Sequence, residues 1–200
     1  MSYEGRPWVG YKGGPALPFW IMLDRLCDVI LSNVPGNIVE IGCGYSTIVL
    51  AKHAEAFGVQ LHTCDYSTRK CNWVKDTFKY EGIKVYNMRS THFIWDFKDE
   101  PAIVFIDGDH RAVVLRKEVD FFLPIVKPNG VIFLHDTCPR ETTYIKKTAG
   151  GKIMDTYVVR KELEQRENKD FDIFTWPYTA GNCGLTMILK KDLTQPFYRI

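Results

Sequence analysis

The segment NIVEIGCGYS, residues 37–46, passes from a short apolar run into a turn that contains two glycines. This pattern predicts a strand at 37–42, a tight turn, and a helix at 47–57. Glycine lets the backbone turn sharply and approach a ligand closely, and the first amides of the following helix face the same place. A dinucleotide-binding fingerprint would have a third glycine where Thr47 stands, so a plain strand-to-helix turn remains an alternative interpretation.

Strand and helix patterns alternate on both sides of this turn. Apolar residues recur at helical spacing at 16–32, before the turn. After it, the sequence predicts strands at 59–64, 83–88, 102–106 and 131–134, and helices at 68–80 (capped by Ser67) and 111–123. The run at 102–106 is continuously apolar, as in a strand that is covered on both faces. This alternation predicts a doubly wound, mostly parallel α/β sheet.

The C-terminal part departs from the alternation. A helix is predicted at 155–166, with Asp155 as its cap and a Glu162–Arg166 pair along one side. Strands follow at 171–175 and 185–189, and the segment between them has no helix. Because parallel strands need a long crossover, this pair is predicted to be an antiparallel hairpin.

Length and composition limit the class of protein. The 200 residues correspond to one ordinary domain, which we divide into an N-terminal arm and helix at 1–35 and a main domain at 36–200. With 46% hydrophobic and 25% charged residues, the chain is neither disordered nor a coiled coil. The net charge is +2 with mixed signs, so nucleic acid is not an expected partner. The apolar stretch at 17–31 carries three charges and is not expected to enter a membrane, and the six cysteines form no CxxC pair, which favours reduced thiols in a cytoplasmic protein. The oligomeric state is left open.

Acidic and histidine residues follow three of the predicted strands. Asp65 ends the second strand, where a carboxylate can accept hydrogen bonds from both hydroxyls of a ribose. The sequence IDGDH at 106–110 ends the fourth strand, and His135 and Asp136 end the fifth. Ligands bind at the carboxyl ends of the strands in open α/β sheets, so these side chains form a candidate reaction centre.

Each of these residues also has a structural interpretation. Asp65 can be a helix cap, and Asp109 is expected to cap the helix that starts beside it. His110 is either a helix-start histidine or a base, and His135 and Asp136 can bond loop amides. Asp107 follows a wholly apolar strand, which makes a capping role the weaker explanation for that residue.

Taken together, these motifs resemble the class I S-adenosylmethionine-dependent methyltransferases, and most closely the small-molecule O-methyltransferase branch with an IDGxH motif. The resemblance covers residues 36–190 and rests on the motif E-x-G-x-G-x-S at 40–46, Asp65, IDGDH at 106–110, the KPNG turn at 127–130 and the HD pair at 135–136. The sequence GNCGL at 181–185 also fits. The resemblance implies a Rossmann-like sheet of seven strands whose last strand is antiparallel.

The resemblance also implies roles for individual residues. The turn, with Glu40, Gly42, Gly44 and Ser46, would bind the methionine half of S-adenosyl-L-methionine, and Asp65 would hold the ribose. Arg89 and Ser90 would lie near the adenine, although the usual acidic residue is replaced by Arg89. Asp107 would contact cofactor or acceptor, and His110 would be the base. In metal-dependent relatives the positions of Asp107, His135 and Asp136 bind a divalent cation, here Mg²⁺ or Mn²⁺, although His135 departs from the common Asp-Asn pair.

The expected reaction is therefore methyl transfer to a hydroxyl of a small molecule or sugar. The chain lacks the Asn-Pro-Pro-Tyr type of motif and the Pro-Cys nucleophile of base-directed enzymes. RNA or protein as the acceptor, a non-catalytic cofactor-binding module, and aminopropyl transfer on the same fold remain alternatives. Aromatic residues Trp8, Tyr11, Trp176 and Tyr178 and the loop at 137–152 are candidate walls of the acceptor pocket.

Overall fold

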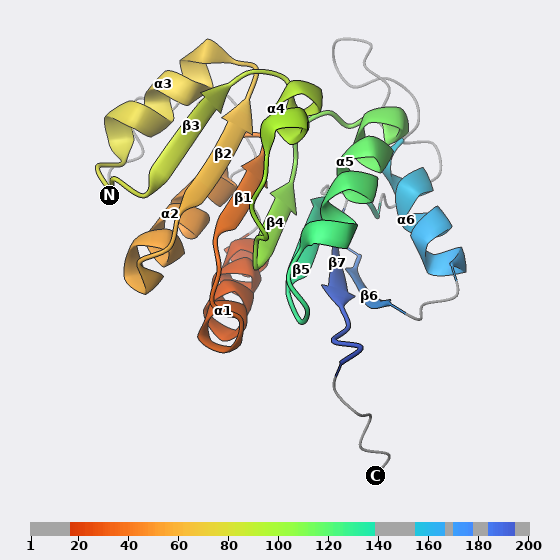
Figure 1. Cartoon of the computed structure of the whole chain (residues 1–200). Coiled ribbons are helices and arrows are strands. Elements are labelled where there is room, and N and C mark those ends of the chain that lie inside the picture. The colour runs from red at the N-terminus through yellow and green to blue at the C-terminus, as the bar shows by residue number, and fades with distance from the viewer. Residues whose placement is uncertain (1–16, 139–154, 167–169, 178–183, 195–200) are drawn as a thin grey trace.

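The computed structural model describes residues 17–138, 155–166, 170–177 and 184–194. Its centre is a seven-stranded sheet in the order β3-β2-β1-β4-β5-β7-β6 (Figure 1). The strands are β1 (Ile38–Ile41), β2 (Leu61–Asp65), β3 (Ile83–Asn87), β4 (Ile103–Ile106), β5 (Val131–His135), β6 (Phe171–Trp176) and β7 (Leu185–Lys190). Among the described strands, β7 alone runs opposite to the other six, so it pairs antiparallel with both β5 and β6. The predicted doubly wound sheet and its terminal hairpin are both confirmed.

In the described part of the chain, three helices cover each face of the sheet. One face carries α1 (Leu17–Asn33), α2 (Tyr45–Phe57) and α3 (Thr68–Thr77), and the other α4 (Ser90–Asp96), α5 (Ala112–Ile125) and α6 (Thr156–Gln165). Alternate residues of β4 enter the two cores, since Phe105 packs with α1 and α2 whereas Val104 packs with α5 and α6. Within the described residues, no helix combines the length and the apolar character needed to cross a membrane.

Helix α4 is an element that the sequence patterns did not predict. It is only seven residues long, which is too short for a helical repeat to be visible in the sequence. Two aromatic rings hold it against the sheet, because Phe93 and Phe97 are buried and pack on each other with ring centroids 5.2 Å apart. Tertiary packing therefore fixes α4 where local propensity gives little signal.

The capping and pairing predicted for α6 are wrong in detail. Asp155 occupies the N-cap position, but its carboxylate accepts a hydrogen bond from the Ala112 amide at the start of α5 instead of capping its own helix. Glu162 pairs with Arg116 at 2.6 Å, and Arg166 lies 3.6 Å from Asp120. Both ion pairs connect α6 to α5, so contacts between helices replace the predicted pair within one helix. The predicted cap of α3 is confirmed, since the Ser67 hydroxyl accepts from the Lys70 amide.

The two glycines of the turn after β1 differ in what they require. Gly42 has φ +96°, and a Cβ there would lie 2.3 Å from the carbonyl oxygen of Asp107. Gly44 has an extended φ of −170°, and a Cβ there would meet only Ser46 Oγ, at 4.0 Å. The fold therefore needs glycine at 42, whereas it tolerates a side chain at 44.

This difference predicts opposite outcomes for matched alanine substitutions. Gly42→Ala should lower the free energy of unfolding by about 2 kcal/mol or more, because left-handed strain and a backbone clash add together. Gly44→Ala should cost less than about 1 kcal/mol, as expected at an N-cap. Urea denaturation of the two variants measures both values, and equal losses in the two proteins would contradict this account of the turn.

Candidate active site

A cavity of about 650 Å³ opens at the carboxyl ends of β1, β2, β3 and β4. Its walls include Gly42 from the turn, Asp65 after β2, Arg89 and Ser90 after β3, and Asp107 after β4. This volume lies within the range of small-molecule and cofactor sites. The crossovers from β1 and β4 lead to opposite faces of the sheet, so the cavity lies at the switch point expected for ligands in this kind of fold.

Glu40 organises the turn from beneath. Its side chain is fully buried, and its carboxylate accepts hydrogen bonds from the hydroxyls of Ser46 at 2.6 Å, Thr47 at 2.8 Å and Thr63. The Thr47 hydroxyl in turn accepts from the Gly44 amide at 2.9 Å. Glu40 and Ser46 therefore lie below the turn, not on the wall of the cavity, which differs from the position predicted for a residue that touches methionine. What the structure shows for both is a role in holding the glycine turn.

Asp65 lies at the wall of the cavity, as predicted, and is already held by its own chain. Its Oδ1 accepts from the Ser67 amide at 2.7 Å, and its Oδ2 accepts from the Cys43 amide at 3.1 Å. The Nζ of Lys70 donates to the same Oδ2 at 3.1 Å. The carboxylate is thus fixed in direction before any ligand is considered.

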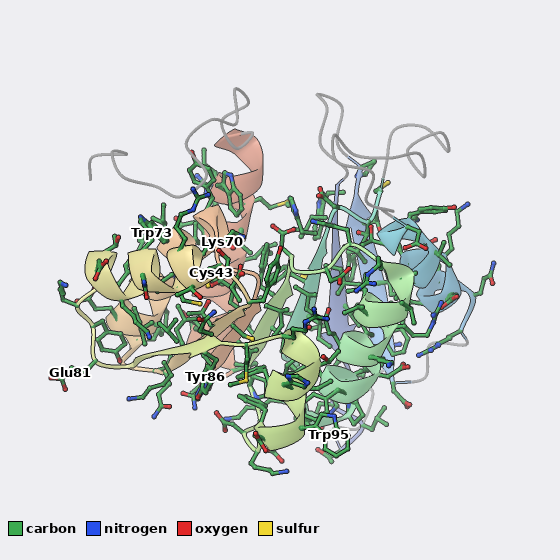
Figure 2. The ribbon with its side chains drawn as sticks, turned by 90° about the horizontal axis from the view of Figure 1, so that it is seen from above. Cys43, Lys70, Trp73, Glu81, Tyr86 and Trp95 are labelled. Carbon is green, nitrogen blue, oxygen red and sulfur yellow. The ribbon has the colours of Figure 1, made fainter. Side chains whose placement is uncertain are left out.

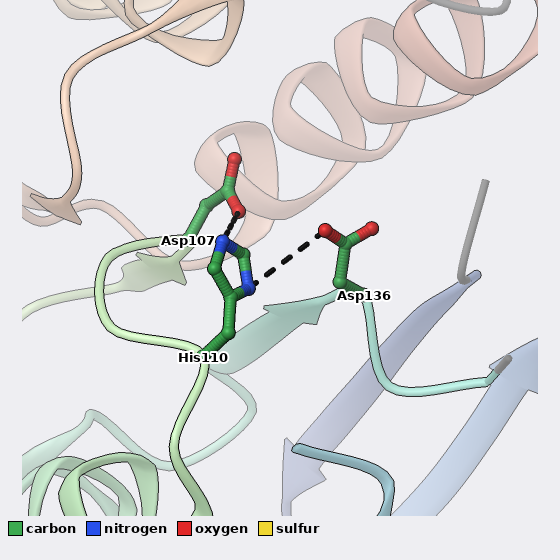
Figure 3. A group of neighbouring side chains, drawn as sticks. All are labelled: Asp107, His110 and Asp136. Atoms are coloured by element: carbon green, nitrogen blue, oxygen red, sulfur yellow. Dashed lines mark ion pairs between the residues drawn. The ribbon is translucent and has the colours of Figure 1, made fainter. Parts of the chain in front are cut away.

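Asp107, His110 and Asp136 come together in space although β4 and β5 supply them separately. His110 lies between the two carboxylates, with Nε2 3.9 Å from Asp107 Oδ1 and Nδ1 3.7 Å from Asp136 Oδ2 (Figure 3). One ligand atom from each of the three residues lies within 4.8 Å of the others. Asp136 adopts φ +56°, an unusual value for a residue with a side chain, and its amide donates to the Gly184 carbonyl at 3.0 Å. The contact with the segment before β7 therefore fixes this backbone.

His135 takes part as a hydrogen-bonding partner of the two acids. Its Nδ1 lies 3.0 Å from Asp107 Oδ1 and 3.4 Å from Asp136 Oδ1. Burial opposes the imidazolium charge, but the two carboxylates outweigh it and raise the pKa of His135 to about 9. Burial likewise raises the pKa of Asp107, but the charges of His135 and His110 outweigh it and bring that pKa below its usual value. The Trp20 ring stacks on one face of the His135 imidazole, with ring centroids 6.4 Å apart.

Other predicted residues do not join this cluster. Asp109 accepts from the Arg111 amide at 3.1 Å and pairs with the Arg111 guanidinium. The predicted helix cap is wrong in detail, because Arg111 occupies the N-cap position of α5 and the Ala112 amide donates to Asp155. The predicted metal set contained His135, whereas the mutually close ligand atoms come from Asp107, His110 and Asp136. Of the aromatic residues predicted to line an acceptor pocket, Trp8, Tyr11 and Tyr178 lie outside the described residues, as does most of the loop at 137–152. Trp176 packs against the core that contains α1.

Sequence reasoning missed several residues of the site. Tyr66 and Lys70 line the cavity, and the ring of Trp20 lies beside both His135 and Tyr45. A signal was available for both, since Tyr66 directly follows the acid that ends β2 and Lys70 lies in the first turn of α3. For Trp20 there was none, because α1 and β5 are brought together only by the fold.

Comparisons with known proteins agree with this geometry. A family model described as a methyltransferase domain matches residues 39–137, which include every strand end that lines the cavity. No curated protein matches the chain.

Solved structures share the fold at low sequence identity. A cofactor-bound protein from MTB, Rv0187, has a TM-score of 0.69 and 18% identity over 91% of this chain and 83% of its own. The O-methyltransferase from Bacillus cereus in complex with SAH has a TM-score of 0.66 and 19% identity, over 89% of this chain and 83% of its own. The O-methyltransferase TomG from Streptomyces achromogenes, in complex with SAM, has a TM-score of 0.64 and 17% identity, over 90% of this chain and 82% of its own. From the family model and this shared fold we conclude that residues 39–137 form a methyltransferase domain, carried by a Rossmann-like fold that the cofactor-bound methyltransferase structures share.

Proposed function

We propose that the chain transfers the methyl group of S-adenosylmethionine to a hydroxyl of a small molecule or sugar. The observation that carries this proposal is the position of His110. It lies between the carboxylates of Asp107 and Asp136, and it lines the same cavity as Asp65. The proposed base and the proposed ribose-binding acid thus line one cavity of about 650 Å³, which supports the proposal.

In this proposal the chain's residues position the acceptor and take its proton. His110 accepts the hydroxyl proton, a step worth roughly 10²–10⁴-fold in rate when the base is well placed. The negative charges of Asp107 and Asp136 hold the ring and stabilise the imidazolium that forms, as the acid does in a catalytic triad. His135 and Trp20 keep Asp107 in place through a hydrogen bond and ring packing.

The cavity fits the cofactor by the chemistry of its walls. When bound, S-adenosylmethionine supplies an electrophilic methyl on a sulfonium, which leaves as a neutral thioether. Asp65 would accept from the ribose, the turn at Gly42 and Gly44 would leave room for the methionine half, and Arg89 and Ser90 would lie near the adenine. The O-methyltransferases TomG and that of Bacillus cereus, which bind SAM and SAH, share this fold and support the assignment.

A divalent cation is a second candidate for activating the hydroxyl. The close approach of one ligand atom each from Asp107, His110 and Asp136 favours it, and such a mixed oxygen and nitrogen set suits Mn²⁺ better than Mg²⁺. In that case the ion would lower the pKa of the acceptor hydroxyl. Against it, Oδ1 of Asp107 already accepts from His135, and the neighbouring Thr137 hydroxyl is engaged by Thr186 at 2.8 Å. We therefore favour His110 as the base.

A small-molecule acceptor is preferred over RNA because the net charge is only +2. The O-methyltransferase TomG, which shares this fold and is involved in tomaymycin synthesis, supports a small-molecule acceptor. A cytoplasmic location is part of the proposal and is supported by the five described cysteines, all of which are free thiols.

The role of His110 is tested by incubating the protein with methyl-labelled S-adenosylmethionine and a fractionated cell extract. We expect label in a low-molecular-mass product, and we expect His110→Ala to lower its rate of formation about 100-fold or more. Affinity for S-adenosylhomocysteine should stay within about twofold, because His110 acts on the acceptor. His92→Ala, which removes an exposed histidine of α4, is the matched control and should keep full activity.

Two outcomes would contradict the proposal. If His110→Ala turns over within a few-fold of the wild-type rate, His110 is a structural residue near the start of α5 and not the base. If the label appears only in RNA or protein, the acceptor is not a small molecule.

Metal removal separates the two ways of activating the hydroxyl. With His110 as the base, activity should survive prolonged dialysis against EDTA and should not rise when Mg²⁺ or Mn²⁺ is added. If EDTA abolishes the transfer and Mn²⁺ restores it, the cation set of Asp107, His110 and Asp136 operates instead. Activity is measured on the product identified in the preceding experiment.

A further inference from the structure

Lys70 covers the carboxylate that would hold the ribose. It is the third residue of α3, and its ammonium lies 3.1 Å from Asp65 Oδ2. Figure 2 shows Lys70 and Cys43 close together, and both donate to that same oxygen. The side chain of Asp65 is only 4% exposed although it belongs to the cavity wall, whereas that of Lys70 is 34% exposed. Both residues line the cavity, and Lys70 is the more exposed of the two.

The acceptor capacity of Asp65 is nearly used up by the chain. A carboxylate offers about four lone-pair positions. Three are taken, by the Ser67 amide, the Cys43 amide and Lys70. A ribose with two free hydroxyls needs two positions, so one existing donor has to leave. The two amides are fixed by the backbone of the turn and of α3, and Lys70 is the flexible donor.

The place of Lys70 in its helix does not explain the contact. A cation in the first turn of a helix is disfavoured by the helix dipole. Burial lowers the pKa of Lys70, but the attraction of Asp65 outweighs it and keeps that pKa above its usual value. The ion pair with Asp65, not the helix, therefore holds the ammonium in the cavity.

We propose that Lys70 is a displaceable plug of the ribose subsite, which the diol of the cofactor must remove from Asp65 in order to bind. This inference rests on the proposed function, since it takes S-adenosylmethionine as the cofactor. It assigns Lys70 as a residue that weakens cofactor affinity and so favours release of the product S-adenosylhomocysteine. Lys70 touches the binding site and takes no part in the methyl transfer.

The first test is a calorimetric titration with S-adenosylhomocysteine, whose net charge is zero. Lys70→Met should bind it roughly fivefold more tightly than the wild-type protein, as expected if a partly exposed ion pair no longer has to be broken. Lys70→Gln, which can still donate one uncharged hydrogen bond, should fall between the two. Lys75→Met removes an exposed lysine from the same helix and should leave the affinity unchanged. Circular dichroism and melting temperature show whether each variant is folded.

Titrations at two salt concentrations and with an altered ligand distinguish displacement of Lys70 from a general structural effect of the substitution. Raising NaCl from 50 to 500 mM screens the ion pair, so wild-type affinity should increase toward that of Lys70→Met, which should itself change little. The 2′-deoxy analogue of S-adenosylhomocysteine needs only one acceptor position, and Asp65 has one to spare. For this analogue the gain in Lys70→Met should shrink to less than twofold.

The outcomes distinguish this inference from the proposed function. Equal or weaker binding of S-adenosylhomocysteine to Lys70→Met, with wild-type binding intact, would overturn the plug and leave the cofactor assignment standing. The same gain for the deoxy analogue would also overturn it. Failure of the folded wild-type protein and all variants to bind S-adenosylhomocysteine would overturn both.

Discussion

The buried carboxylate of Glu40 is the constraint on which the site depends. Burying a carboxylate costs several kcal/mol unless hydrogen bonds replace its hydration. The hydroxyls of Ser46, Thr47 and Thr63 supply these bonds, although burial still raises the pKa of Glu40 to about 7. The Thr47 hydroxyl also accepts a hydrogen bond from the Gly44 amide, which a glycine at position 47 could not do. The turn that leads from β1 to α2 is thereby fixed from below.

Ion pairs hold the acidic side chains at both ends of the cavity. At one end Asp65 is paired with Lys70, and at the other Asp107 accepts from His135. Each acid that the proposed function uses is thus held by a basic side chain of the same protein, which fixes its direction and limits the cost of placing it near a low-dielectric wall. The two ends differ in burial: the Lys70 side chain is 34% exposed, whereas that of His135 is 16% exposed and lies under Trp20. A partly exposed cation suits binding and release, and a more buried cation suits alignment of the acid beside it.

Most of the fold could be predicted from the sequence because its signals are local. The apolar runs, the glycine turn and the missing helix before β7 each depend on neighbouring residues, and so does the position of Asp65 at a strand end. What could not be predicted depends on contacts between distant segments. Helix α4 exists because its aromatic rings are buried, and Asp155 serves α5 instead of its own helix. Asp107, His110 and the His135–Asp136 pair were identified as separate motifs, but that both histidines lie beside the two acids follows only from the spatial arrangement.

The central claim is that the cavity binds S-adenosylmethionine through Asp65, and calorimetric titration of the cofactor into the wild-type protein and Asp65→Ala tests it most directly. The account predicts measurable binding to the wild-type protein. It predicts a loss of about 30-fold or more in the folded variant, because charge-assisted hydrogen bonds to the ribose worth roughly 2 kcal/mol or more disappear. Equal affinity of the two proteins, or no binding to the folded wild-type protein, would contradict it.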